Sequence, residues 1–277
     1  MKSEQRELSG WGNTSPSVAS IVDVSGSELS RPGSLAELGA LPRGVIVRGL
    51  GRSYGDPAQN GGGTVLRLSG DDAPLVLDAE AGMLTAGAGI SLDTILRDIV
   101  PRGWFVPVTP GTRFVTVGGC IASDVHGKGH HADRSFGSHV VAMTMLLADG
   151  TIERITPETH ADLWWATIGG MGLTGIILDA TFRLIPIETG HFLVDTERVP
   201  NLDALLERME DGDHQYRYSV AWIDLVATGT SLGRSVLSLG NHATLGELRS
   251  YEPKAALDPL AFDPPVLPDV PVGMPNV

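Results

Sequence analysis

A glycine-rich stretch within the first seventy residues has the composition of a phosphate-binding loop. It begins Val47-Arg-Gly-Leu-Gly-Arg-Ser-Tyr-Gly-Asp56 and continues through Gln59-Asn-Gly-Gly-Gly63, so that glycine fills six of the fifteen positions from Gly49 to Gly63. Glycine loses conformational entropy in a helix or a paired strand, which disfavours both structures here. A tightly bent backbone can instead direct several amide groups at one anion such as a phosphate.

Three other interpretations of this stretch are open at the level of sequence. Gly51-Arg-Ser-Tyr-Gly55 fits the G-x-S-x-G pattern of a hydrolase nucleophile elbow, and the first glycines partly fit the G-x-G-x-x-G pattern of a dinucleotide-binding fold. Both motifs require a helix directly after the turn, whereas Asp56-Pro57 and three further glycines follow. A plain surface turn is the third alternative, although a turn alone does not need so many glycines.

Three glycine-rich segments, in this order, resemble the cofactor-binding segments of vanillyl-alcohol-oxidase-type flavoenzymes. They are Arg48 to Asp56, Pro110 to His131 and Trp165 to Ile177. The resemblance implies an α+β fold with a two-subdomain FAD-binding domain of the PCMH type over residues 1–190. The start of an antiparallel-sheet substrate domain is expected over residues 191–277. The implied activity is that of an FAD-dependent oxidoreductase that transfers a hydride from a CH–OH group to flavin N5.

The resemblance also assigns cofactor contacts along these segments. The residues implied are Arg48, Gly49, Leu50, Gly51, Arg52, Ser53, Tyr54, Gly55, Asp56, Gln59, Gly111, Thr116, Val117, Gly118, Gly119, Cys120, Ala122, Ser123, His126 and Ile177. Many members of the family carry, at the position of Arg52, a histidine bonded covalently to the flavin. Arginine cannot form that bond, so non-covalent FAD is expected, with the Arg52 guanidinium able to pair with phosphate.

Four residues are expected in the reaction pocket from the same resemblance. Tyr54 and His126 are placed near the flavin ring, and Lys128 is a cation able to attract a phosphorylated substrate. Trp222 is placed in the substrate pocket, with core packing as its alternative, because aromatic residues at period two often fill a sheet face. His126 is a candidate base, but the sequence leaves the identity of the base open.

A narrower resemblance concerns the substrate. Leu8 to Ser17, Gly55 to Asn60 and His126 to His131 resemble those members that oxidise the ribose 2′-hydroxyl of a polyprenyl-phosphate sugar during actinobacterial cell-wall arabinan synthesis. This implies a polyprenyl-phosphate sugar substrate and an epimerase-reductase subunit as a possible partner. Residues expected after the substrate domain have no counterpart before Val277, so an incomplete form is expected. The alternatives are an aldonolactone or other sugar oxidase of the same fold, and a non-catalytic FAD-binding remnant or a subunit that needs a partner chain.

Composition excludes several classes of function. The formal charge of −13 and a pI near 4.9 argue against a nucleic-acid-binding protein. No apolar run approaches the length of a membrane span, and the N-terminus lacks the apolar region of a Sec signal peptide. The expected location is the cytoplasm or the cell envelope, with peripheral membrane contact as a possibility. No metal is expected, because His126, His130, His131, Asp124 and Asp133 lack the spacing of a metal-binding helix.

Short strands and helices alternate in the predicted secondary structure. Cys120, the single cysteine, is expected to be a small buried residue. The expected strands are 44–47, 65–68, 75–77, 84–86, 174–186, 216–224 and 233–239, with a hairpin of 140–148 and 151–155 around Asp149-Gly150. A helix is expected after the cap Ser91, with Leu92, Ile95, Leu96 and Ile99 on its apolar face. A second is expected after the cap Asn201, with Leu202, Leu205, Leu206 and Met209 on one face, and a short one around Leu163-Trp164. From Pro253 the sequence is rich in proline, and no closing element is expected.

Overall fold

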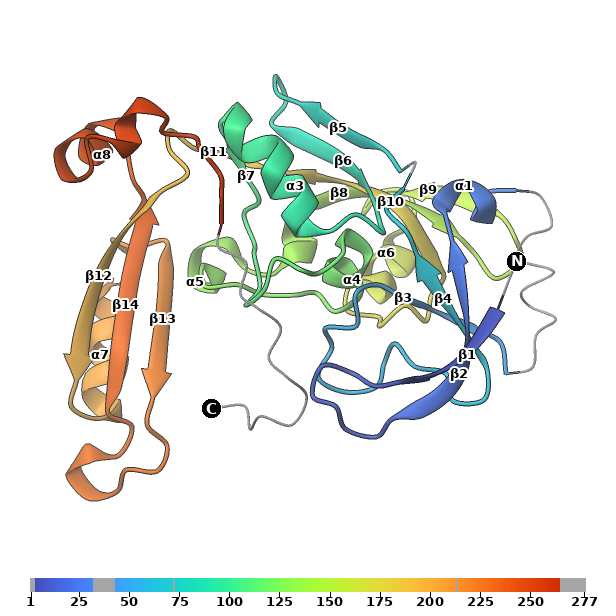
Figure 1. Ribbon diagram of the computed structural model, residues 1–277, viewed down its shortest axis with the longest axis horizontal. Coiled ribbons are helices and arrows are strands. Elements are labelled where there is room, and N and C mark those ends of the chain that lie inside the picture. The colour runs from blue at the N-terminus through green and yellow to red at the C-terminus, as the bar shows by residue number, and fades with distance from the viewer. Residues whose placement is uncertain (1–2, 32–42, 72, 213, 265–277) are drawn as a thin grey trace.

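The computed structural model describes residues 3–31, 43–71, 73–212 and 214–264. Its helices and antiparallel sheets confirm the α+β class. Two sheets and their helices form one body, and a smaller three-stranded sheet stands beside it (Figure 1). In the part of the chain described, no helix has the length and hydropathy that crossing a bilayer requires.

The first sheet has the strand order β1-β2-β4-β3 and is mixed. Its strands are β1 (Ser3–Leu8), β2 (Ser17–Val24), β3 (Val45–Arg48) and β4 (Thr64–Leu68), followed after β2 by the short helix α1 (Gly26–Leu29). β3 and β4 are parallel neighbours, with Val45 opposite Thr64. A parallel pair needs a connection that returns along the sheet. Here the glycine-rich stretch is that connection, so the loop is held at both ends by the same sheet.

The second sheet has the order β5-β6-β10-β8-β9 and is antiparallel throughout. Its strands are β5 (Leu75–Asp78), β6 (Met83–Gly87), β8 (Val140–Leu146), β9 (Ile152–Ile155) and β10 (Ile176–Arg183), and its helices are α3 (Leu92–Ile99), α4 (Val117–Ala122), α5 (His130–Asp133) and α6 (Ala161–Thr167). β7 (Trp104–Phe105) and β11 (Ile185–Pro186) form a separate pair. One large core contains buried side chains from both sheets, including Leu66 of β4 and Leu84 of β6.

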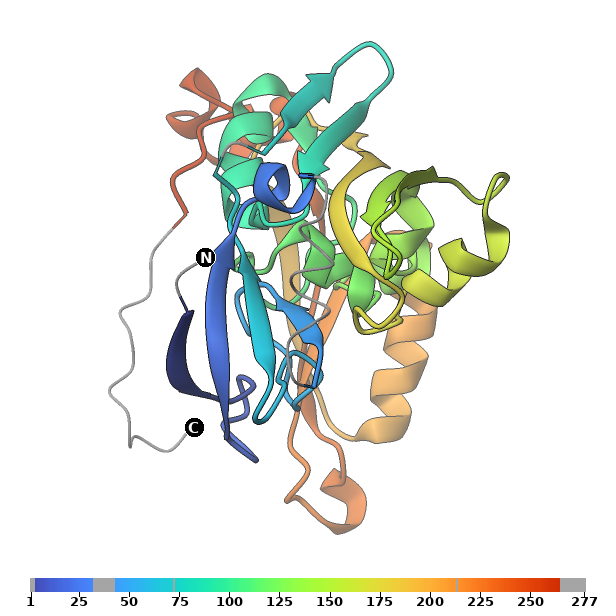
Figure 2. The ribbon, with the colours of Figure 1, turned by 90° about the vertical axis from the view of Figure 1, so that its right-hand side faces the viewer.

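The third sheet has the order β12-β14-β13 and its own small core. Its strands are β12 (Phe192–Val199), β13 (Tyr218–Ile223) and β14 (Ser235–His242), and α7 (Leu202–Gly212) and α8 (Leu245–Tyr251) accompany them. α7 covers one face, where Leu205 packs with Leu237 and Leu239. Figure 2 shows the β13–β14 connection projecting from the end of this sheet. Phe262 packs back on the large core, so residues 191–264 contact the first body at more than one place.

Several predicted elements are confirmed with their caps. The hydroxyl oxygen of Ser91 accepts a hydrogen bond from Thr94 N (3.1 Å), and the predicted apolar face of α3 is buried. Asn201 Oδ1 accepts from Ala204 N at the start of α7. The hairpin of β8 and β9 forms around Asp149-Gly150.

Other predictions need correction. The strand expected over 174–186 ends at Arg183, because Leu184 N bonds to Gly82 O and Ile185 then pairs with Phe105. The apolar face of α7 is narrower than expected, since Leu206 is 57% exposed. The helix α8 ends just before the proline-rich end, which itself contains a 3-10 turn at Ala255–Leu257 although no closing element was expected there. The remainder of this end, residues 265–277, lies outside the described residues.

Candidate functional site

The three glycine-rich segments come together in the structure. Thr116 Oγ1 occupies the space that a Cβ would need at Gly49, so the first segment lies directly on the second. Met171 N donates to Ala122 O (2.8 Å), which joins the third segment to the second. Gly172 in turn approaches Ile46 of β3, with 3.8 Å between its Cβ position and Ile46 Cδ1. Each of the three segments therefore contacts another one or the strand β3, and the contacts gather around α4 and the start of the glycine-rich loop.

Arg48 holds the loop in shape from inside. Its Nη2 donates to Ser9 O (2.7 Å) and its Nη1 to Ala58 O (3.1 Å). Gly51 turns above the guanidinium with a φ of 67°, and a Cβ at Gly51 would collide with it. Burial lowers the pKa of Arg48. These bonds show that Arg48 supports the backbone of the loop.

The N-terminal segment braces the other side of the loop, a role the sequence did not reveal. Trp11 N donates to Ser53 O (2.6 Å), and the ring of Trp11 meets that of Tyr54 edge-on at 5.4 Å. Gly10 lies against Gly55 O with no room for a Cβ. The Gln59 amide lies 2.7 Å from Ser17 Oγ, beside this segment. The glycines at positions 10 and 12 were the available signal, but only the folded loop shows what they contact.

The backbone amides of the loop are available to a ligand. From Leu50 to Asp56, no amide donates to a backbone or side-chain acceptor among the described residues. Arg52, Tyr54, Gly55 and Asp56 are exposed on the same stretch. No helix follows the turn before β4 begins at Thr64, which excludes both the nucleophile elbow and the dinucleotide-binding fingerprint. A bent loop with a run of free donors and a nearby arginine fits the pyrophosphate of FAD.

The first turn of α4 is built differently, since its amides already have acceptors. Val117 N donates to Ile90 O, Gly118 N to Ala88 O and Gly119 N to Thr116 Oγ1. The side chains of Val117 and Cys120 lie fully inside the core, and burial raises the pKa of the Cys120 thiol. α4 therefore gives the site a close-packed wall, and its glycines allow that closeness.

The remaining predicted cofactor residues lie at the edges of this wall. Ser123 Oγ is 3.9 Å from Met171 Sδ, on the side where the third segment crosses α4. Ile177 is buried on β10. A Cβ at Gly111 would meet no atom within 4 Å, so open space adjoins the backbone there.

Tyr54, His126 and Lys128 present their side chains to solvent. Tyr54 is 76% exposed. The rings of His126 and His130 meet edge-on at 5.7 Å. Lys128 has no carboxylate within 4.0 Å among the described residues. The structure thus leaves the charge of Lys128 open to an anionic ligand.

Trp222 is not a core residue. It is 80% exposed on β13 and lines a groove of about 660 Å³ together with Arg198 and Arg234. Ser219, three residues earlier on the same strand, donates from its amide to Lys128 O (2.9 Å). The strand therefore connects the Trp222 groove to the loop that carries Lys128.

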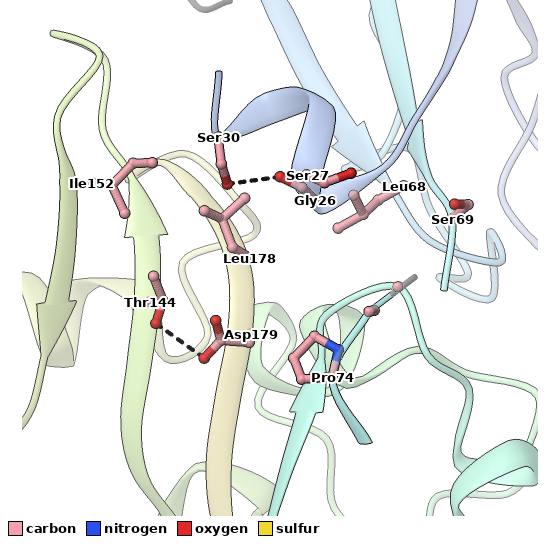
Figure 3. A pocket seen from close by; sticks show the side chains of 12 residues that line it. Gly26, Ser27, Ser30, Leu68, Ser69, Pro74, Thr144, Ile152, Leu178 and Asp179 are labelled. Carbon is pink, nitrogen blue, oxygen red and sulfur yellow. Dashed lines mark hydrogen bonds between the residues drawn. The ribbon is translucent and has the colours of Figure 1, made fainter. Parts of the chain in front are cut away.

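A smaller cavity of about 210 Å³ lies between α1 and the second sheet (Figure 3). Asp179 accepts a hydrogen bond from Thr144 Oγ1 (3.0 Å) at its wall, and burial raises the pKa of Asp179. None of the predicted cofactor or pocket residues lines this cavity. It is separate from the site described above.

Known proteins resemble this chain in sequence across the glycine-rich segments. Residues 35–156 match the family model described as FAD binding domain. The chain is 45% identical over 275 residues to decaprenylphosphoryl-beta-D-ribose oxidase of Mycolicibacterium smegmatis, covering 98% of this chain and 59% of that protein.

Two more distant relatives match shorter stretches. L-gulonolactone oxidase of Mus musculus is 30% identical over 171 residues, covering 60% of this chain and 38% of that protein. Delta(24)-sterol reductase of Rattus norvegicus is 32% identical over 134 residues, covering 48% and 26%. The chain thus spans less than two thirds of the length of these relatives. The match of residues 35–156 to an FAD-binding family model, together with the similarity to the Mycolicibacterium smegmatis oxidase, indicates FAD as the cofactor.

Proposed function

We propose that the protein is an FAD-dependent oxidoreductase that oxidises the ribose 2′-hydroxyl of a polyprenyl-phosphate sugar. The observation that carries this proposal is the 45% identity to a decaprenylphosphoryl-beta-D-ribose oxidase over 98% of the chain. That alignment extends through the three-stranded sheet that bears Trp222, whereas the match to L-gulonolactone oxidase covers 60% of the chain at 30% identity. The match to L-gulonolactone oxidase makes a sugar-lactone oxidase of the same fold the second candidate, and its lower identity and coverage rank it below the first.

The glycine-rich loop holds the cofactor in this proposal. The free amides from Leu50 to Asp56 bind the pyrophosphate, and Arg52 adds a charge-assisted bond. FAD is held without a covalent bond, because arginine offers no nucleophile for attachment to the flavin. When bound, FAD supplies the acceptor for the hydride that leaves the carbinol carbon.

The chain's own side chains bind and orient the substrate. Lys128 pairs with the substrate phosphate, and its lack of a carboxylate partner among the described residues supports this role. Trp222 packs against an apolar or sugar surface of the substrate from its groove. Tyr54 and His126 adjoin the cofactor, and His126 is our candidate for taking the hydroxyl proton.

The proposed substrate also sets the cellular context. Its prenyl chain is lipid, so the enzyme works at the cell envelope or at the cytoplasmic face of a membrane, through peripheral contact. A 2′-keto sugar is a substrate for reduction at the same carbon, and an epimerase-reductase subunit is the partner that we propose for that step. The resulting sugar is a precursor of cell-wall arabinan.

One assay tests the proposal against its alternatives. The FAD-loaded chain is incubated with a prenylphosphoryl ribose and an artificial electron acceptor, alone and together with the C-terminal region of the Mycolicibacterium smegmatis oxidase. We expect a 2′-keto product in the combined sample. Oxidation of L-gulonolactone in place of the prenylphosphoryl ribose would favour the lactone oxidase. FAD binding without turnover in either sample would favour a non-catalytic FAD-binding subunit.

A further inference from the structure

The loop that carries His126 and Lys128 is fastened to the three-stranded sheet. Ser219 N of β13 donates to Lys128 O (2.9 Å), and His131 Nε2 lies 2.9 Å from Tyr216 O. α5, which follows this loop, lies beside the sheet in Figure 1. The loop that carries His126 and Lys128 therefore runs along the edge of β13, the strand that also carries Trp222.

An ion pair secures the same junction. Arg217 donates from Nε to Asp133 Oδ2 (2.8 Å) and from Nη2 to Asp133 Oδ1 (2.5 Å). Asp133 is buried, and its backbone oxygen lies 2.7 Å from His139 Nε2, which ties it to the FAD-binding part. Two parallel bonds between a guanidinium and a carboxylate fix orientation as well as distance. A buried carboxylate that loses its partner is strongly unfavourable, so this pair resists opening.

Gly129 makes the close approach of the two parts possible. A Cβ at this position would stand 2.8 Å from Asp133 Oδ2 and 3.1 Å from Arg217 O. Both atoms belong to the ion-paired residues, and the second is backbone of the strand region. Any side chain at position 129 would push the loop and the sheet apart.

We infer that Gly129, Asp133 and Arg217 form a positioning clamp that sets the placement of Lys128 relative to Trp222. The clamp determines how the two ends of the substrate pocket face each other, while the glycine-rich loop that binds FAD lies elsewhere. The inference rests on the proposed function only in naming Lys128 and Trp222 as pocket residues. Asp133 and Arg217 are positioning residues, because they act through the loop and the strand.

The first test is amide hydrogen exchange in the 277-residue chain. In Arg217→Gln, the exchange of the Ser219 amide should rise about tenfold or more, because its acceptor on the loop is no longer held in place. Arg217→Lys keeps the charge but loses the two-bond geometry, so it should give an intermediate rate. Arg208→Gln is the matched control: it breaks the Arg208–Glu197 pair (2.8 Å), which lies within the three-stranded unit, and should leave Ser219 unchanged.

The second test measures the placement of the two parts directly. Cysteines introduced as Asp162→Cys on α6 and Glu207→Cys on α7 carry spin labels at exposed positions. Cys120 is buried and should stay unlabelled. Pulsed electron–electron double resonance measures the distance between the two labels. The parent chain should show one narrow distance distribution, and the distribution should broaden when Arg217→Gln or Gly129→Ala is added. Gly26→Ala, where a Cβ meets no atom within 4 Å, is the control for the glycine variant.

The outcomes separate this inference from the proposed function. Neither measurement requires FAD or turnover, so both can succeed even if the chain proves inactive on the prenylphosphoryl ribose. FAD affinity should fall less in Arg217→Gln than in variants of the glycine-rich loop, because the clamp holds only the loop of His126 among the proposed cofactor contacts. Unchanged Ser219 exchange together with an unchanged distance distribution in Arg217→Gln would overturn the clamp. A loss of FAD affinity as large as that caused by changes in the loop would also overturn it.

Discussion

The hydroxyl of Thr116 stands in the space that a side chain at Gly49 would occupy. Thr116 also caps α4, where its Oγ1 accepts from Gly119 N (3.2 Å). One threonine therefore sets the start of a helix and the closest approach of the glycine-rich loop to that helix. We expect the proposed cofactor site to depend on this contact, because it fixes how closely the start of the glycine-rich loop approaches α4.

A methyl group at position 49 should disturb both parts of this contact. Gly49→Ala is expected to destabilise the fold by about 2 kcal/mol, as overpacking of a close contact typically does, and to weaken FAD binding about tenfold or more. Thermal unfolding and FAD titration measure the two effects. Gly26→Ala, placed in open space, should change neither. A Gly49→Ala chain with full stability and full FAD affinity would show that the loop does not need this approach.

Arg48 and Arg52 should differ in role: Arg48 supports the fold of the loop, and Arg52 binds the ligand. Arg48→Met removes the bonds to Ser9 O and Ala58 O, so it should lower both the unfolding temperature and the affinity for FAD. Arg52→Met should weaken FAD binding about tenfold, the value of one charge-assisted bond, with the unfolding temperature unchanged. Equal behaviour of the two variants would contradict the separate roles.

His242 should make stability depend on pH below neutrality. Its ring lies 4.1 Å from that of Phe192 and 4.8 Å from that of Phe105, and burial and the nearby Arg217 lower its pKa to about 4. In the unfolded chain His242 becomes protonated near pH 6.5, whereas in the folded chain it becomes protonated only near pH 4. Stability is therefore full above pH 6.5 and falls between pH 6.5 and 4, by up to about 3 kcal/mol.

Replacement of this ring isolates its contribution. His242→Phe should flatten the fall in the free energy of unfolding between about pH 6.5 and about pH 4, because the aromatic packing remains and the titrating group is gone. Denaturant unfolding across that range measures the slope. His160→Gln, at an exposed position, should keep the parent slope. An unchanged slope in His242→Phe would assign the pH dependence to other groups.

Trp222 should matter to substrate and not to cofactor. Trp222→Ala removes an exposed side chain from the groove beside Arg198 and Arg234, so the affinity for FAD should stay within about twofold. In any preparation that turns over a prenylphosphoryl ribose, the same change should raise KM. A large loss of FAD affinity would place Trp222 at the flavin instead.

Elements marked by local sequence signals, such as a helix cap or a hairpin turn, could be predicted from the sequence. The helix after Ser91 and the hairpin at Asp149-Gly150 follow from local signals that act within a few residues. The strands β1 and β12 were not predicted, since their side chains are mostly exposed and lack a clear alternation. α4 was also missed, because glycine disfavours a helix and only contacts such as Gly118 with Ala88 explain its presence.

Part of the candidate site could likewise be predicted from the local sequence, and part depends on contacts between distant segments. Residue types located the loop from Arg48 to Gly63, and its connection between two parallel strands explains its length. The inward direction of Arg48 and the support from Trp11 could not be predicted, because they depend on contacts between distant segments. The Asp133–Arg217 pair joins residues 84 positions apart, and no local pattern marks it.

Titration of the purified chain with FAD tests the central claim most directly. Flavin absorption and fluorescence are followed during the titration, and the protein is then precipitated with acid. We expect saturable binding of one FAD per chain, weakened by Gly49→Ala and Arg52→Met, with all flavin released into the supernatant. Flavin retained in the precipitate would contradict non-covalent binding. A folded chain that binds no FAD would contradict the assignment of the site itself.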